Sequence, residues 1–314
     1  MLLSAFLLLP SSRASAARAP LDLAGAILLT GAIVSLVLAL SQMASPEAGM
    51  VQVLLPGTLA VVFGVIFIVV ERRSQHPLVP LSMFRRRSLS VANLMALLTI
   101  AIASLLAFIL TLYLQSVLGF SPMVTGLAFL PAGVGGIAGG QIAIRAIRRM
   151  GLRGASALGP GLIALGSVLL TRITPAGGVA WVVVGYLIAG VGIVCTVVTT
   201  TIAATAHLGP ELQGLAAGLL NTAQQVGAAL GISLASVVAT SIALAAGGAP
   251  MVAATTGYQA TLYLALGLSV ITAALTLLAD EPASRSPSIR AHRPVSNNGP
   301  EQHLSDKLPL EANS

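Results

Sequence analysis

Residues 91–114 read VANLMALLTIAIASLLAFILTLYL, a run that holds no Asp, Glu, Lys or Arg. A bilayer core about 30 Å thick is crossed by a helix of roughly 20 apolar residues. Apolar residues occupy the whole circumference of this helix, whereas a surface helix of a soluble protein shows a single apolar stripe. The run therefore predicts a transmembrane helix.

The rest of the chain has the same character. Of its 314 residues, 56% are apolar and only 8% are charged, whereas a soluble domain carries about 25% charged residues. Too few charges are present to solvate two soluble domains, which the length alone would suggest. We expect an all-α polytopic membrane protein with eight transmembrane helices: Leu21–Gln42, Val51–Val70, Val91–Leu114, Met123–Ile147, Gly154–Thr171, Val179–Ala204, Gly214–Ala243 and Gly257–Ala279.

The basic residues predict the orientation of these spans. With eight spans, alternate loops lie on one side, and that side holds every Lys and Arg except Arg172. Positive charge near span ends marks the cytoplasmic side. We therefore expect a multi-pass protein of the cell membrane with both termini in the cytoplasm. The net charge of +7 follows from topology, which excludes nucleic acid as a partner.

The two ends of the chain differ from the spans. The opening MLLSAFLLLP precedes Ala14-Ser15-Ala16, which resembles a cleavage site, but Arg13 and Arg18 follow the apolar run. A signal peptide carries its basic residues before that run. We therefore interpret residues 1–20 as the end of a truncated helix and a linker. Residues 280–314 are rich in Pro, Ser and Asn, which predicts a disordered cytoplasmic tail.

The sequence offers no catalytic centre in the membrane. His76, His207, His292 and His303 lie outside the predicted spans, and all acidic residues lie in loops, at span ends or in the tail. Chemistry within the bilayer requires an ionisable group inside the bundle. One cysteine, Cys195, also excludes a cysteine-based metal site. We expect no enzyme activity, no cofactor and no metal, and no intramembrane carboxylate for proton coupling.

Three strings resemble one family of transporters: HPLVPLSMFRRRSLSVANL, LYLQSVLGFSPMVTGLAFLPAG and PELQGLAAGLLNTAQQVGAALGISLA. They resemble the major facilitator superfamily, in its fourteen-helix drug–proton antiporter branch (EmrB/QacA type). The second string carries the Tyr-x-Gln, Gly-x-Ser-Pro, Gly and Pro pattern on Tyr113, Gln115, Gly119, Ser121, Pro122, Gly126 and Pro131. Two positions depart from the pattern: Arg148 stands where the family often has Asp, and Gln224 precedes Gln225 where the family often has Arg.

The resemblance implies the C-terminal part of a proton-driven multidrug efflux carrier that works by alternating access. Residues 21–90 would then hold two inserted helices and a cytoplasmic loop, and residues 91–279 a six-helix half-bundle. Its partners would be the lipid bilayer, a small amphipathic substrate and an N-terminal half-transporter. Two alternatives stay open: a non-transporting membrane fragment, and a carrier of a lipid or metabolite on the same scaffold.

Polar side chains within the spans are the substrate-cavity candidates. At about 100° per residue, Gly214, Gly218, Asn221 and Gln225 fall on one stripe of their helix. Hydrogen bonding to neighbouring helices is the alternative role for these amides, and self-bonding to helix carbonyls is the favoured alternative for the threonines. The remaining candidates are Gln224, Asn93, Tyr113, Gln115, Thr196, Thr199 and Thr200, and the predicted helix-packing positions are Gly135, Gly139, Gly227 and Gly231.

Overall fold

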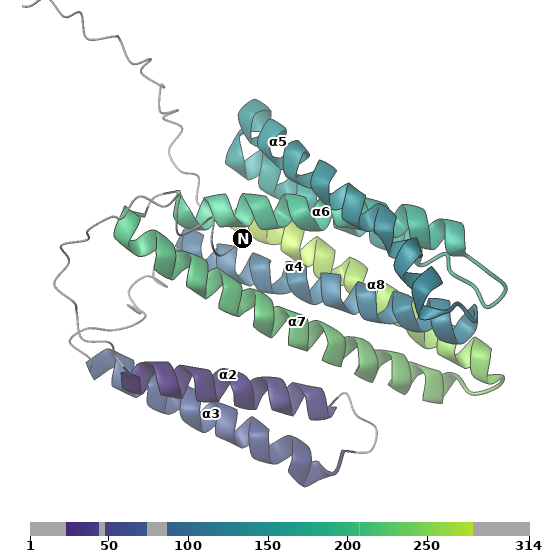
Figure 1. Cartoon of the computed structure of the whole chain (residues 1–314), viewed down its shortest axis with the longest axis horizontal. Helices are drawn as coiled ribbons and strands as arrows, with labels where there is room; N and C mark the ends of the chain where they lie inside the picture. Colours follow the sequence, from purple (N-terminus) through teal and green to yellow (C-terminus); the bar gives the residue numbers. More distant parts are fainter. Residues whose placement is uncertain (1–22, 44–47, 74–86, 207, 279–314) are drawn as a thin grey trace, which may run out of the picture. The chain divides into compact units, whose positions relative to one another are not determined.

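The computed structural model describes residues 23–43, 48–73, 87–206 and 208–278. The expected leading segment 1–20 and the expected tail 280–314 lie outside these residues. Seven helices of the described chain are long and apolar enough to cross a membrane, which confirms the all-α membrane fold (Figure 1). They are α2 (Leu23–Met43), α3 (Met50–Arg73), α4 (Arg87–Leu112), α5 (Pro122–Leu170), α6 (Val179–Thr205), α7 (Pro210–Ala246) and α8 (Pro250–Leu278), and a π-helical turn, η2 (Tyr113–Val117), continues α4.

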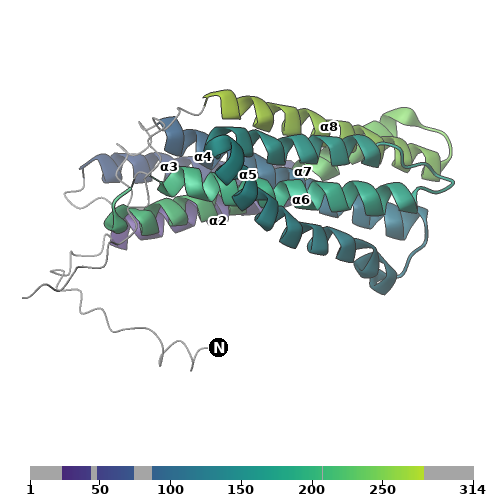
Figure 2. The same cartoon turned by 90° about the horizontal axis from the view of Figure 1, so that it is seen from above.

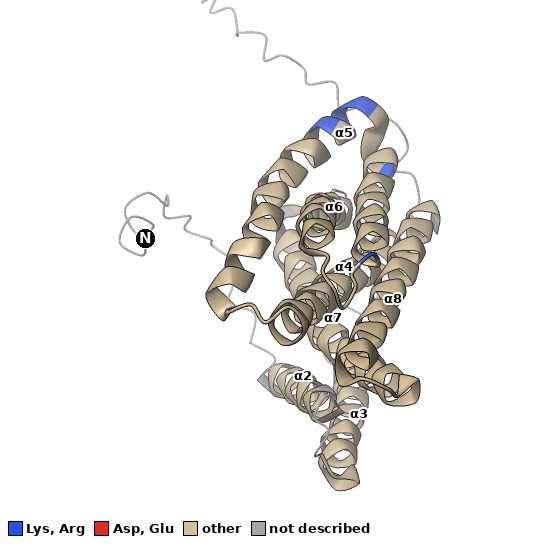
Figure 3. Ribbon diagram, turned by 90° about the vertical axis from the view of Figure 1, so that its right-hand side faces the viewer, with Lys and Arg blue, Asp and Glu red and all other residues tan. Residues whose placement is uncertain are grey.

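Helix α5 covers two of the expected spans without a loop between them. Its 49 residues would reach about 73 Å as a straight helix, more than twice the thickness of a bilayer core. Gly151 breaks the helix with a φ of 75°, a left-handed conformation that glycine adopts without a steric penalty. Basic residues gather at this bend (Figure 3). The expected count of eight crossings stays a prediction, in which each arm of α5 crosses once.

Helix α4 supplies more of the buried core than any other described helix. Ile102, Leu105, Leu106, Ile109 and Leu110 are completely buried, and they cover more than one side of the helix. Helices α6, α7 and α8 all contact α4, and they run alongside it in both views (Figures 1 and 2). Lipid gives no hydrophobic drive between helices, so close van der Waals packing holds this group together.

Glycines allow α5 and α6 to touch backbone to backbone. A Cβ atom added at Gly135 would lie 2.7 Å from the carbonyl oxygen of Leu187, and one at Gly139 would strike Val191. In the second arm of α5, Gly159 faces Gly192, and Gly166 faces Gly185. Both arms of α5 therefore pack on α6, which positions them relative to α4.

The glycines of α7 serve the contact with α4. A Cβ atom at Gly227 would strike the backbone of Leu97, and one at Gly231 would strike Ala101. The spacing of four residues puts both glycines on one side of α7. Helices α2 and α3 form a separate pair, and α2 also contacts α7.

Candidate functional site: an open face on α4 and α7

The stripe of Gly214, Gly218, Asn221 and Gln225, here called the amide stripe, is exposed on α7. No atom lies within 4 Å of a Cβ position built at Gly214 or Gly218. The stripe is turned by more than 100° from the side that packs on α4 through Gly227 and Gly231. Gln224 is partly exposed and lies between the two sides. The structure therefore leaves two amides on a face that the described helices do not cover.

A second partly exposed stripe runs along α4. It contains Asn93, Ile100, Ser104, Ala107 and Thr111, whose spacing places them on one side of the helix. Asn93 donates to the carbonyl of Leu89 at 2.9 Å, and Thr111 donates to the carbonyl of Ala107 at 2.7 Å. Together with the amide stripe, these residues form what we call the open face.

Two pockets flank the α4 stripe. One, of about 540 Å³, lies between α4, α5 and α6 and includes Ala103. The other, of about 290 Å³, lies between α4, α7 and α8 and includes Phe108. Ala103 and Phe108 each lie within about 60° of the stripe around the helix, on opposite edges of it. We call them the α5–α6 pocket and the α7–α8 pocket.

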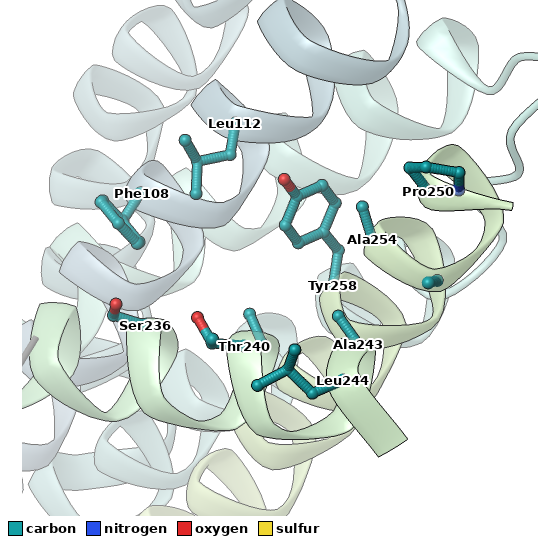
Figure 4. Close-up of a pocket in the computed structure, with 11 residues that line it drawn as sticks. Phe108, Leu112, Ser236, Thr240, Ala243, Leu244, Pro250, Ala254 and Tyr258 are labelled. Atoms are coloured by element: carbon teal, nitrogen blue, oxygen red, sulfur yellow. The ribbon is translucent and has the colours of Figure 1, made fainter. Parts of the chain in front are cut away.

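The α7–α8 pocket extends the amide stripe toward the end of α7. Ser236 and Ala243 continue the periodicity of Asn221 and Gln225 and line this pocket. In Figure 4 the hydroxyls of Ser236 and Thr240 point into the gap, opposite the ring of Tyr258. Apolar side chains make up most of the remaining wall, so the pocket combines a few polar groups with an apolar lining, as small-molecule sites do.

Four of the expected cavity residues lie away from the open face. Thr196, Thr199 and Thr200 are buried, and their hydroxyls donate to carbonyls of α6 itself, for example Thr196 to Gly192 at 2.8 Å. Tyr113 is completely buried. Self-bonding satisfies hydroxyls that have no water to bond with. Gln115 is partly exposed in η2.

The roles of Tyr113 and Gln259 were not predicted from the sequence. The Tyr113 hydroxyl donates to the carbonyl of Thr174 at 3.0 Å, and Gln259 Nε2 donates to the carbonyl of Ile173 at 2.7 Å. Helices α4 and α8 thus both hold the loop between α5 and α6. Gln259 is an isolated amide in an apolar helix, which was the one signal that could have identified it.

Charged groups are scarce around the open face. Among the described residues, no group of three His, Cys, Asp or Glu side chains could hold a metal ion. Glu71, in the last turn of α3, is 3% exposed, so it is buried more deeply than a position at a span end suggests. Arg153 donates to the carbonyl of Leu277 at 3.3 Å, at the bend of α5. Arg148 is exposed at the same bend.

Comparison with known proteins identifies the family of this chain. The sequence profile of the Major Facilitator Superfamily matches residues 1–232. The chain belongs to this superfamily. Similar members include a puromycin resistance protein of Streptomyces alboniger, 35% identical over 89% of this chain and 59% of that protein. A lincomycin resistance protein of Streptomyces lincolnensis is 31% identical over 91% of this chain and 58% of that protein.

A third member of the superfamily, a tetracenomycin C resistance and export protein of Streptomyces glaucescens, is 31% identical over 76% of this chain and 45% of that protein. The superfamily and these relatives are transporters and resistance proteins. The chain spans less than two thirds of the length of each of them.

Proposed function

We propose that this chain is the C-terminal part of a proton-driven multidrug efflux carrier that works by alternating access. Membership in the Major Facilitator Superfamily and relatives named for antibiotic resistance and export support this proposal. The domain limits 21–90 and 91–279, with two inserted helices before a six-helix half-bundle, and the fourteen-helix branch are parts of the same proposal. So are its place in the cell membrane and the cytoplasmic location of both termini.

The observation that carries the proposal is the open face. The side of α7 that bears Gly227 and Gly231 is closed against α4, whereas Asn221 and Gln225 are exposed. Polar side chains avoid lipid and face a bundle interior or a water-filled cavity. Alternating access rocks one half of a carrier against another around a site at their interface. An opposing N-terminal half-transporter would cover the open face and enclose a small amphipathic substrate.

Proton coupling places a further demand on that opposing half. It requires a titratable group at membrane depth, and in the described part of α4 to α8 the side chains of the open face are amides, hydroxyls and apolar groups. The proposal therefore assigns the coupling carboxylate to the other half and substrate contact to both.

Dye efflux from energised cells that lack their own pumps tests the proposal. The chain alone should insert in the membrane and give no efflux that an uncoupler abolishes. Coexpression with the N-terminal part of the Streptomyces alboniger relative should restore part of that efflux. Uncoupler-sensitive efflux by the chain alone would contradict the half-carrier proposal, and failure of every N-terminal partner to restore efflux would contradict the transport function.

A further inference from the structure

The α5–α6 pocket has walls of two kinds. Phe129 and Tyr186 form a tilted aromatic pair on one side, with ring centroids 4.9 Å apart and planes at 60°. Gly133, Gly136 and Gly190 line other parts of the wall. Of these three, Gly133 has open space at its Cβ position, whereas Val194 and Ala132 lie against those of Gly136 and Gly190. Its volume of about 540 Å³ falls within the range of about 300–1,000 Å³ for pockets that hold small molecules.

The chemistry of these walls favours one class of ligand. None of the described residues that line the pocket carries a charge, so nothing there compensates the desolvation of a charged group. Aromatic rings attract other rings through offset or edge-to-face contacts. Glycine lets a flat group approach the helix backbone more closely than any residue with a Cβ atom allows.

We propose that the α5–α6 pocket binds an uncharged, flat aromatic group of the transported molecule. The group lies against the backbone of α5 at Gly133 and contacts the rings of Phe129 and Tyr186. This inference rests on the proposed function in one respect, namely that the bound molecule is one the carrier transports. Binding itself requires only the folded half-bundle and not an active carrier.

The position of the pocket supports this assignment. Ala103 links it to the α4 stripe and hence to the open face. A molecule with an aromatic group in the pocket therefore extends its polar part toward the α4 stripe, where Ser104 and Asn93 lie. The pocket selects for ring shape, and the amides and hydroxyls contact the rest of the molecule.

The test uses the 314-residue chain in lipid nanodiscs and the neutral photoreactive probe 1-azidopyrene. After irradiation, mass spectrometry locates the labelled peptides. We expect label on residues 129–137 of α5 and 186–194 of α6. Excess pyrene should suppress this label, whereas perhydropyrene, its saturated and non-planar counterpart, should suppress it at least tenfold less effectively.

Gly133 and Gly126 provide a matched pair of variants. No atom lies within 4 Å of a Cβ position at either residue, so both accept a side chain without a backbone collision, and both lie on α5. Gly133 lines the pocket and Gly126 does not. Gly133→Leu should reduce the pyrene-sensitive label about tenfold, and Gly126→Leu should leave it unchanged.

A change of ring chemistry provides the second variant. Phe129→Leu keeps an apolar side chain but removes the ring, and it should weaken competition by pyrene several-fold more than competition by perhydropyrene. Equal label in wild type and Gly133→Leu, or equal competition by the two hydrocarbons, would overturn the inference. The second result would indicate a site for acyl chains.

These outcomes are independent of the transport test. Loss of the labelling pattern with efflux intact would place the substrate elsewhere on the open face. Labelling as expected, with no efflux in any combination of halves, would keep the aromatic site and remove the carrier function.

Discussion

At the scale of single residues, exposure separates two groups of polar side chains. Asn221 and Gln225 are exposed on α7, whereas Thr196 and Thr200 bond to their own helix and are buried. Helical periodicity predicted the amide stripe, and the tendency of threonine to bond carbonyls of its own helix already favoured the amides over these hydroxyls. A threonine hydroxyl easily reaches the carbonyl four residues earlier in its own helix, so it is less available to a substrate than an amide is.

Replacement of either amide tests its role in a complete carrier. Asn221→Leu or Gln225→Leu should reduce dye efflux about fivefold, or change which dyes are exported, because a hydrogen bond worth about 1 kcal/mol is lost. Protein abundance should stay similar. Gln52→Leu, which removes an exposed amide from α3, is the control and should change efflux less than twofold. Reduced abundance with normal efflux per molecule would show that the amides serve packing instead.

Two glycines of α7 give opposite expectations for the same change. Gly231→Ala adds a Cβ atom against the backbone of Ala101, whereas Gly218→Ala adds one into open space. Alanine favours a helix over glycine by about 1 kcal/mol, but forcing an extra methyl into a tight contact costs about 1–3 kcal/mol. Thermal unfolding in detergent should therefore show a lower Tm for Gly231→Ala and an equal or higher Tm for Gly218→Ala. Equal shifts would mean that α4 and α7 are not in close contact there.

At the scale of elements, the loop between α5 and α6 is held from two directions. Tyr113 at the end of α4 and Gln259 in α8 donate to the adjacent carbonyls of Thr174 and Ile173. Tyr113 begins the π-helical turn, and such turns occur often at functional sites. The loop, the end of α4 and the start of α8 therefore form one connected unit at this end of the bundle.

Loss of one of these bonds should loosen the loop. Tyr113→Phe removes one of the two donors to the carbonyl of Thr174, which also accepts from the amide of Gly177, at a cost of about 0.5–1.5 kcal/mol. Hydrogen–deuterium exchange of the amides of Thr174 and Gly177, which bond to each other's carbonyls, should speed up about fivefold. Tyr263→Phe is the control because Tyr263 is 60% exposed. Unchanged exchange in Tyr113→Phe would show that the phenol contributes nothing to the loop.

At the scale of the whole molecule, span length was predictable and contacts were not. Apolar length and composition predicted most helix ends within about four residues, because a bilayer imposes one length on every crossing. The exception is α8, which begins at Pro250 and not at the expected Gly257. A bend at Gly151 stands where a loop was expected. A single glycine with a positive φ can change the direction of a helix, which then continues after it. The pair Phe129–Tyr186 and the bond from Gln259 were not predictable, because periodicity gives the face of a helix but not the neighbour it meets.

Orientation is the property of the whole chain that labelling can test. Met150, at the bend of α5, is 55% exposed, and Ala176 is exposed in the loop after α5. Cys195 is buried and free, so it gives little background. A membrane-impermeant thiol reagent added to intact cells should label Ala176→Cys and not Met150→Cys, because positive charge marks the cytoplasmic side. The reverse pattern would invert the topology.

The facing glycines of α5 and α6 limit which substitutions this protein can accumulate during evolution. A methyl group at Gly159 would meet the backbone of Gly192, and one at Gly192 would meet the backbone of Gly159; Gly166 and Gly185 have the same reciprocal relation. Side chains such as Thr196 and Leu170 lie near these positions too, but main-chain atoms block each of the four. No substitution in the opposite helix therefore clears them. We expect inherited variation at these four positions to be confined to glycine, while Gly161, which faces open space, varies freely. Substrate preference can then evolve on the open face while the α5–α6 contact behind it stays fixed.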